Sequence, residues 1–373
     1  MFLNEKSLWE EFLRKSIGKE VKVLNIEPIK RDKSYTGGLG SAYFIEIESE
    51  KGRERVVAKI SGKKFGRENP EDRARDALWV HRTSTLPRQP KAIAVGSITK
   101  DGKIIPLKSD SEYVVVLEEA KGISYHIYLN NILELSRKFN QGLSEYDIRA
   151  ALNLSDYLVE IHKRGGYPDL YKRHIGEIVG GPEGILGVDR LLWKVLDEEE
   201  VRKNFGREKK ELRKDIIKLK KKAIEHADRI EDLTHRCSCI HGDFHPFENI
   251  RFSEYPKEFW VLDRSRAEFG EPADDVTAMW INYLNYALLD EGSYKGKFKK
   301  LGDSFFENYL KKTNDYEMLK VVQPFFIWRG LVISTPVWYP ETPLDVRNKI
   351  FNFMKNVSEV EEFNLKEVNS YLK

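Results

Sequence analysis

The chain has 373 residues, of which 40% are hydrophobic and 12% aromatic, a composition typical of a globular protein with two domains or one enlarged domain. Its 63 basic and 60 acidic side chains leave a net charge of only +3, which excludes a strong overall field for nucleic acid or an anionic membrane. Without a long apolar run, a signal-peptide pattern or more than two cysteines, we expect a cytoplasmic protein that contacts neither membrane nor nucleic acid.

The first third of the chain shows mainly strand patterns. An amphipathic helix is predicted over 5–16 and a charged helix over about 71–82. Apolar residues alternate with polar ones over 41–48, which is typical of a half-buried strand. The other predicted strands are 21–26, 55–60, 92–98 and 113–117. These elements predict an antiparallel sheet with one main helix over 1–117.

Residues 118–122 indicate a linker, and the pattern beyond them becomes mostly helical. A hairpin is predicted from 250–253 and 259–263. The very basic helix over 207–230 is interrupted by acidic residues and lacks aromatic ones, so a solvated face is favoured over a nucleic-acid surface. Cys237 and Cys239 lack a second cysteine pair, which favours buried strand residues over a zinc site.

The strongest chemical signal is the segment His241-Gly242-Asp243-Phe244-His245-Pro246-Phe247-Glu248-Asn249, followed by Asp263. Phosphoryl transfer from a nucleotide needs one carboxylate beside the attacking hydroxyl. It also needs an amide oxygen and a second carboxylate that hold Mg²⁺ against the phosphates. Asp243 is therefore predicted to orient and deprotonate the acceptor hydroxyl, with Asn249 and Asp263 as metal ligands. A chance polar turn is the plain alternative, but order, spacing and flanking apolar strands favour catalysis.

This segment resembles the aminoglycoside phosphotransferase and choline kinase superfamily, a branch of the protein-kinase-like fold, in which His-Gly-Asp-x-His-x-x-Asn is a common catalytic loop. Residues 270–275, Gly-Glu-Pro-Ala-Asp-Asp, resemble the Gly-Asp-Pro-x-x-Asp that follows in that family. The resemblance implies an α+β, two-lobed fold that binds ATP or GTP with Mg²⁺. The expected parts are a nucleotide lobe over 1–117, a hinge over 118–122 and a catalytic and acceptor lobe over 123–373.

The same resemblance assigns supporting roles around the loop. Asp275 would be a structural acid beneath it, and His241 would pack and hydrogen-bond under it. His245 would either cap the loop, which we favour, or touch the substrate. The loop is one residue longer than is usual in the family, so Glu248 takes the family's asparagine position. Whether Glu248 or Asn249 faces the metal stays open.

A glycine-rich turn lies between two predicted strands, at Gly37-Gly38-Leu39-Gly40-Ser41. Glycines such as Gly38 and Gly40 let backbone N–H groups approach nucleotide phosphates, and the Ser41 hydroxyl is a further donor. An ordinary hairpin turn is the alternative. The downstream catalytic motif favours phosphate contact.

Lys59 lies on the following strand, where a lysine can hold the α- and β-phosphates if a helix acid orients it. Asp76 is the first candidate for that acid and Glu71 the second. The family resemblance further implies that backbone groups of the hinge, at Glu118 and Ala120, contact the nucleotide base.

The acceptor is expected to be a small molecule with a hydroxyl group, and Trp338 and Tyr339 either line its pocket or pack in the core. Acidic residues at 268, 271 and 274 favour a polycationic acceptor, whereas the basic residues around 202–222 favour a neutral or anionic one. Two other readings stay open, an inactive nucleotide-binding regulatory protein and a protein or RNA kinase. The oligomeric state is left open by the sequence.

Overall fold

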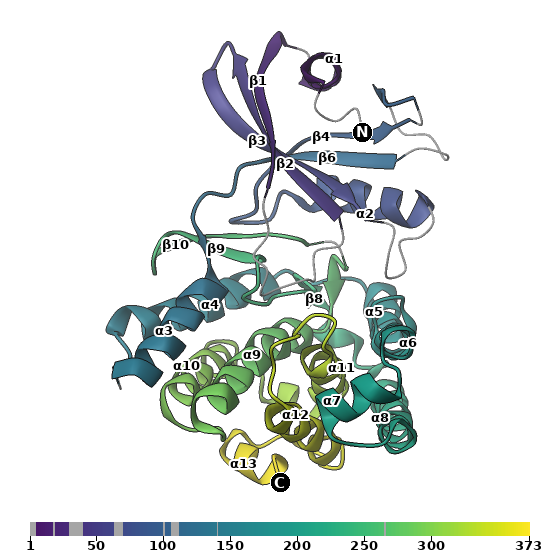
Figure 1. Cartoon of the computed structure of the whole chain (residues 1–373), viewed down its shortest axis with the longest axis vertical. Coiled ribbons are helices and arrows are strands. Elements are labelled where there is room, and N and C mark those ends of the chain that lie inside the picture. Colours follow the sequence, from purple (N-terminus) through teal and green to yellow (C-terminus); the bar gives the residue numbers. More distant parts are fainter. Residues whose placement is uncertain are drawn as a thin grey trace. The chain divides into compact units, whose positions relative to one another are not determined.

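The computed structural model describes residues 5–17, 19–29, 40–62, 70–99, 101–105, 112–139, 141–264 and 266–373. The chain forms two compact units (Figure 1). Of the described residues, the N-terminal unit comprises those up to Lys121 together with those from Trp260 to Arg266, and the C-terminal unit comprises those from Gly122 to Phe259 and from Ala267 to Lys373. The division into lobes joined by a hinge at 118–122 stays a prediction.

The N-terminal unit is a six-stranded antiparallel sheet in the order β1-β2-β3-β6-β4-β5. Its elements are α1 (Lys6–Ile17), β1 (Val21–Pro28), β2 (Gly40–Ser49), β3 (Gly52–Ser61), α2 (Pro70–Thr83), β4 (Ala92–Ile98), β5 (Ile104–Ile105) and β6 (Glu112–Glu118). The strands and helices predicted here are confirmed to within a few residues. Strand β5 was not predicted, because two residues carry no readable alternation.

The core of this unit lies between α1 and one face of the sheet. Trp9 and Leu13 of α1 are fully buried with Ile45 and Val114 in one apolar cluster. Burying each such side chain contributes roughly 1.5–3 kcal/mol. Helix α1 comes so close to β4 that a Cβ on Gly96 would lie 2.4 Å from the Phe12 ring, so a larger residue there would require the ring to move.

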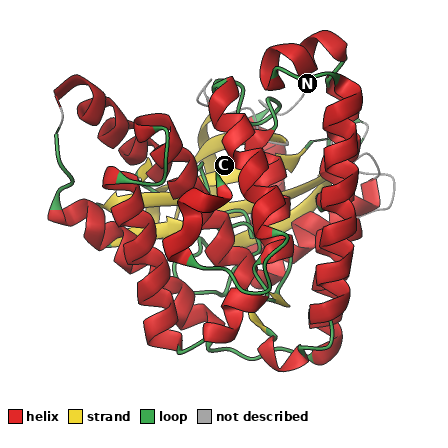
Figure 2. Cartoon of the chain, turned by 90° about the horizontal axis from the view of Figure 1, so that it is seen from below, coloured by secondary structure: helices red, strands yellow, loops and turns green. Residues whose placement is uncertain are grey.

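Helices make up most of the C-terminal unit (Figure 2). They are α3 (Tyr125–Phe139), α4 (Glu145–His162), α5 (Pro168–Gly180), α6 (Ile185–Val195), α7 (Glu198–Phe205), α8 (Lys209–Ile230), α9 (Ala273–Glu291), α10 (Gly296–Thr313), α11 (Gln323–Ser334), α12 (Leu344–Val357) and α13 (Val368–Tyr371). The short strands are β7 (Ile123–Ser124), β8 (Ser238–Cys239), β9 (Ile250–Glu254), β10 (Glu258–Val261) and β11 (Phe269–Gly270). The last two residues of β10 belong to the N-terminal unit. The predicted hairpin is β9 with β10, and the predicted basic helix is α8, whose Lys210, Lys214 and Lys218 are exposed.

Helix α9 is the centre of this unit, and residues 273–288 are buried. Its Trp280 is fully buried and contacts the rings of Tyr294, Phe306, Phe326, Phe353 and Phe363. This packing fixes the first turn of the helix, which carries Asp274 and Asp275. The predicted α+β class, an antiparallel sheet part with a larger helical part, is confirmed. None of the helices that the structure describes is long and apolar enough to cross a bilayer.

Candidate active site

The loop 241–249 connects β8 to β9, and Asp275 anchors its first turn. The two carboxylate oxygens of Asp275 accept hydrogen bonds from the backbone N–H groups of His241 and Gly242, each at 2.7 Å. His162 on α4 contacts the same carboxylate at 3.0 Å. Asp275 is fully buried, and its place in the first turn of α9 suits a negative charge. The structure therefore places Asp275 beneath the loop, where a supporting role was predicted.

Two histidines fix the loop from within. His241 is fully buried, and its Nδ1 accepts a hydrogen bond from the Asp243 N–H at 3.2 Å. The Nδ1 of His245 accepts one from the Phe247 N–H, also at 3.2 Å. This bond leaves the ring proton of His245 on Nε2, which lies 3.5 Å from Oδ2 of Asp243. His245 thus caps the loop and faces the predicted catalytic carboxylate.

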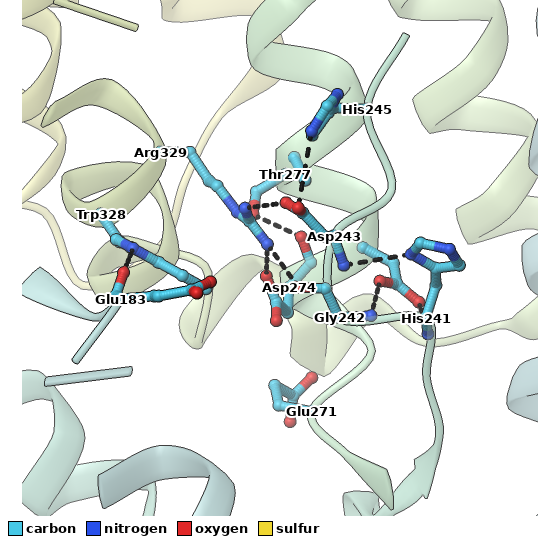
Figure 3. Close-up of polar contacts among 12 residues, drawn as sticks. Glu183, His241, Gly242, Asp243, His245, Glu271, Asp274, Thr277, Trp328 and Arg329 are labelled. Carbon is cyan, nitrogen blue, oxygen red and sulfur yellow. Dashed lines mark hydrogen bonds and ion pairs between the residues drawn. The ribbon is translucent and has the colours of Figure 1, made fainter. Parts of the chain in front are cut away.

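Arg329 on α11 holds that carboxylate from the other side (Figure 3). Its Nη1 donates to Oδ1 of Asp243 at 2.8 Å, and its Nη2 donates to the Gly242 carbonyl at 3.0 Å and to Asp274. No role was predicted for Arg329 from the sequence, and the structure places it on a buried helix. The sequence does carry a signal, because Arg329 is the one charged residue of a mostly apolar helix.

The end of the loop presents Asn249 and Glu248 differently. The Nδ2 of Asn249 donates to the Asp243 carbonyl at 2.8 Å, which orients the amide and leaves its Oδ1 as the possible cation ligand. Glu248 has a positive φ of 60°, and its carboxylate accepts a hydrogen bond from Arg251 at 2.8 Å. Asn249 is thus held beside the predicted catalytic residue, whereas Glu248 is paired with Arg251.

The other predicted metal ligand belongs to the N-terminal unit. Asp263 has a positive φ of 64° and forms an ion pair with Lys59 of β3. The predicted lysine and the predicted metal-binding aspartate are therefore brought together within one unit. Asp76, the first candidate partner of Lys59, is buried on α2. The side chain of Glu71, the second candidate, lies outside the described residues.

Two of the remaining nucleotide candidates lie at the start of a strand of the same unit. Gly40 and Ser41 begin β2 opposite Ser61 and Ile60 of β3. A Cβ on Gly40 would lie 1.9 Å from the Ile60 carbonyl oxygen, so strand pairing alone requires glycine there. Gly38 lies outside the described residues.

At the predicted hinge, Glu118 ends β6 and its N–H already donates to the Lys91 carbonyl at 3.0 Å. The N–H of Glu118 is therefore already engaged within its own unit. Ala120 follows β6, outside any strand or helix.

The candidate acceptor residues show packing contacts. The Tyr339 hydroxyl donates to Oδ1 of Asn282 at 3.1 Å, and its ring meets Phe247 of the loop 241–249 edge-on, with centroids 5.2 Å apart. Trp338 and Tyr339 are both partly buried. Tyr339 thus packs against the loop 241–249 and helps to hold it in place.

Two of the three acidic residues proposed for a polycation are already paired. Glu271 is fully buried and accepts hydrogen bonds from Arg236 at 2.7 and 2.8 Å and from Tyr171 at 2.9 Å. Asp274 is 1% exposed and contacts Arg329 and His174. The expectation that these carboxylates offer charge to a ligand is therefore wrong, because burial requires each to be neutralised within the fold.

No family model matches the chain, and no curated protein does. Among solved structures, the amicoumacin kinase hAmiN, in a complex with AMP-PNP and Ca²⁺, aligns over 92% of this chain and 91% of its own, with a TM-score of 0.53 and 11% identity. A type VIII aminoglycoside-3'-phosphotransferase covers 83% of this chain and 94% of its own (TM-score 0.48, 13% identity). An ethanolamine kinase from Plasmodium vivax covers 93% of this chain and 80% of its own (TM-score 0.44, 14% identity). The likeness to hAmiN shows that the chain has the kinase-like fold that the catalytic motif predicted.

Proposed function

We propose that this protein is an ATP-dependent phosphotransferase that transfers the γ-phosphoryl group to a hydroxyl group of a small molecule. The observation that carries this proposal is the fixed carboxylate of Asp243, which is held by Arg329 at 2.8 Å on a loop that Asp275 anchors. A carboxylate fixed in this way is suited to orienting an attacking hydroxyl. The fold shared with hAmiN, a kinase that was solved with an ATP analogue, supports it.

The proposed chemistry uses the oxygen of Asp243 that Arg329 does not hold. The acceptor hydroxyl donates a hydrogen bond to Oδ2, and Asp243 takes its proton as the hydroxyl oxygen bonds to the γ-phosphorus and the bond to the β-phosphate oxygen breaks. His245 Nε2–H, 3.5 Å from Oδ2, helps to hold the carboxylate plane. Because the transition state is loose, most of the rate comes from such alignment and from charge neutralisation.

The nucleotide is proposed to bind the N-terminal unit. Lys59 contacts the α- and β-phosphates, with Asp76 as its helix partner, and Gly38, Gly40 and Ser41 supply donors to the phosphates. The base is proposed to meet backbone groups of Glu118 and Ala120. This arrangement is supported by the positive charge of Lys59 near the end of β3, which suits a contact with phosphate groups.

A divalent cation fits the proposed donor set. The Asn249 amide oxygen and the Asp263 carboxylate are hard oxygen ligands of the kind that Mg²⁺ prefers. The bond from Asn249 Nδ2 to the Asp243 carbonyl turns the amide so that Oδ1 is its remaining polar atom. When bound, the ion would neutralise charge on the phosphates.

The acceptor is proposed to be a neutral or anionic hydroxyl compound. Glu271 and Asp274, the buried acids nearest the loop in sequence, are paired with arginines and so do not provide an acidic pocket. This argues against a polycationic acceptor that would depend on these two carboxylates.

The test is a coupled ADP-release screen of sugars, polyols, amino alcohols and nucleosides with MgATP. We expect one class to raise ADP release, and we expect Asp243→Ala and Asp263→Ala to abolish it while circular dichroism stays native. Activity retained in both variants would overturn the mechanism. A wild-type protein that binds ATP but shows neither transfer nor Mg²⁺-dependent hydrolysis would instead be an inactive nucleotide-binding protein.

A further inference from the structure

Arg329 is a buried cation in an apolar helix. It is 4% exposed, and its neighbours along α11, such as Ile327 and Leu331, are fully buried. Taking a guanidinium group out of water costs several kcal/mol unless other groups compensate it. The compensation at this position comes from Asp243 and Asp274, the first of which is the proposed catalytic residue.

The guanidinium group joins three parts of the C-terminal unit (Figure 3). One nitrogen, Nη1, contacts the Asp243 side chain, and the other, Nη2, contacts both the Gly242 carbonyl and Asp274 of α9. The guanidinium also lies over the ring of Trp328, with its Cζ 3.9 Å from the centroid. A planar fork with fixed donor directions constrains a carboxylate more strongly than a single point charge does.

The anchor of Arg329 is itself fixed. Asp274 contacts Nε2 of His174 at 3.2 Å, and Nδ1 of His174 accepts the Glu271 N–H at 3.1 Å. That backbone bond places the ring proton of His174 on Nε2, so His174 donates to Asp274. A connected series of hydrogen bonds thus runs from α5 through α9 and α11 to the catalytic loop.

We infer that Arg329 is a positioning residue for phosphoryl transfer. It holds Oδ1 of Asp243, so that Oδ2 is the oxygen presented to the acceptor hydroxyl. The inference rests on the proposed function, because it gives Arg329 a task only if Asp243 receives a proton. The competing explanation is a buried ion pair that contributes to stability alone.

Arg236 offers a matched control for that explanation. It is also a buried arginine of the C-terminal unit, but it donates hydrogen bonds to the carboxylates of Glu271, Asp315 and Glu317. Within the described part of the chain, none of these three carboxylates contacts Arg329 or Asp243, and Glu271 takes part in the series above only through its backbone N–H. Removing Arg236 should therefore lower stability without changing the turnover of the folded protein.

The experiment measures ADP release from MgATP by the full chain. The phosphoryl acceptor is water in one series and any compound that the screen identifies in the other. For Arg329→Ala we expect kcat to fall about 100-fold, the size of effect that misplacing a reacting group by about 1 Å produces. KM for MgATP should stay unchanged. Millimolar guanidinium chloride, far below denaturing concentrations, should restore part of kcat by occupying the vacated site. Arg236→Ala should melt earlier, keep the wild-type kcat and show no rate increase with guanidinium.

The outcomes separate the inference from the proposed function. Wild-type kcat in Arg329→Ala, or a natively folded variant whose lost kcat guanidinium does not restore, would overturn the positioning role. If Arg329→Ala fails to fold, Arg329→Lys replaces it in the test. Lysine keeps a buried cation at this position but lacks the planar fork of donors. Wild-type kcat in Arg329→Lys would also overturn the positioning role. A wild-type protein without MgATP turnover would overturn the proposed function, and the inference with it.

Discussion

Lys59 and Asp263 form an ion pair within the N-terminal unit, although most of the C-terminal unit's chain lies between them in sequence. The pair joins the residue proposed to hold the nucleotide phosphates to one proposed to hold the metal. Both side chains are partly exposed, at 34% and 45%, so the pair itself adds little to stability. Its importance is expected to lie in nucleotide binding.

Lys59→Met is therefore expected to weaken binding of MgAMP-PNP by roughly tenfold or more, since a hydrogen bond to a charged group is worth about 1.5–3 kcal/mol. Isothermal titration calorimetry measures this directly, without turnover. Lys22→Met removes an exposed lysine from β1 and should bind the nucleotide like the wild type. Equal affinities for all three proteins would contradict the role of Lys59.

Asp275 is expected to make the fold sensitive to acid. Burial alone raises the pKa of its carboxyl group, but the hydrogen bond and charge of His162 and the charge and N–H of His241 outweigh this and leave the pKa below its usual value. A carboxyl group whose pKa is lower in the folded state stabilises the fold above the unfolded-state pKa of about 3.9, and that stabilisation is lost as pH falls through the folded-state pKa.

Asp275→Asn should consequently lose about 3 kcal/mol of unfolding free energy at pH 7, because it leaves buried donors without their charged acceptor. The difference in unfolding free energy between wild type and Asp275→Asn should narrow below about pH 4. Urea unfolding at a series of pH values measures both quantities. A gap that stays constant with pH would show that the charge of Asp275 is not the stabilising feature.

Tyr339 is expected to act mainly by packing. Tyr339→Phe keeps the ring against Phe247 and loses one hydrogen bond to Asn282, so unfolding free energy should fall by about 1 kcal/mol with little change in turnover. Tyr339→Ala removes the brace and should lower kcat as well. If Tyr339→Phe instead raises KM for the acceptor while stability is unchanged, the hydroxyl group contacts the substrate.

Cys237 is expected to be unreactive in the native protein. Both cysteines are buried free thiols, and burial, followed by the negative charge of Glu271, raises the pKa of Cys237 to about 11. Because the thiolate is the reactive form, labelling by a disulfide reagent at pH 8 should be slow in the native state and fast after unfolding. Rapid native labelling of Cys237 in a Cys239→Ser background would contradict this.

The sequence by itself determined the parts of the molecule that depend on neighbours in the chain. Alternation and helical periodicity located the elements of the sheet unit, since each pattern is complete within one strand or helix. The order of Asp243, Asn249 and Asp263 predicted the catalytic loop and, through it, the kinase-like fold. Strand β5 was not predicted because two residues are too few to show the alternation of a strand.

Only the tertiary structure decided which charges meet. Arg329 lies 86 residues from Asp243, and the two are joined because buried α9 and α11 bring the helix to the loop. The same packing paired Glu271 and Asp274 internally, although the sequence left them available to a ligand. Burial requires that each charge find a partner, but the choice of partner depends on how distant helices pack, which no local pattern records.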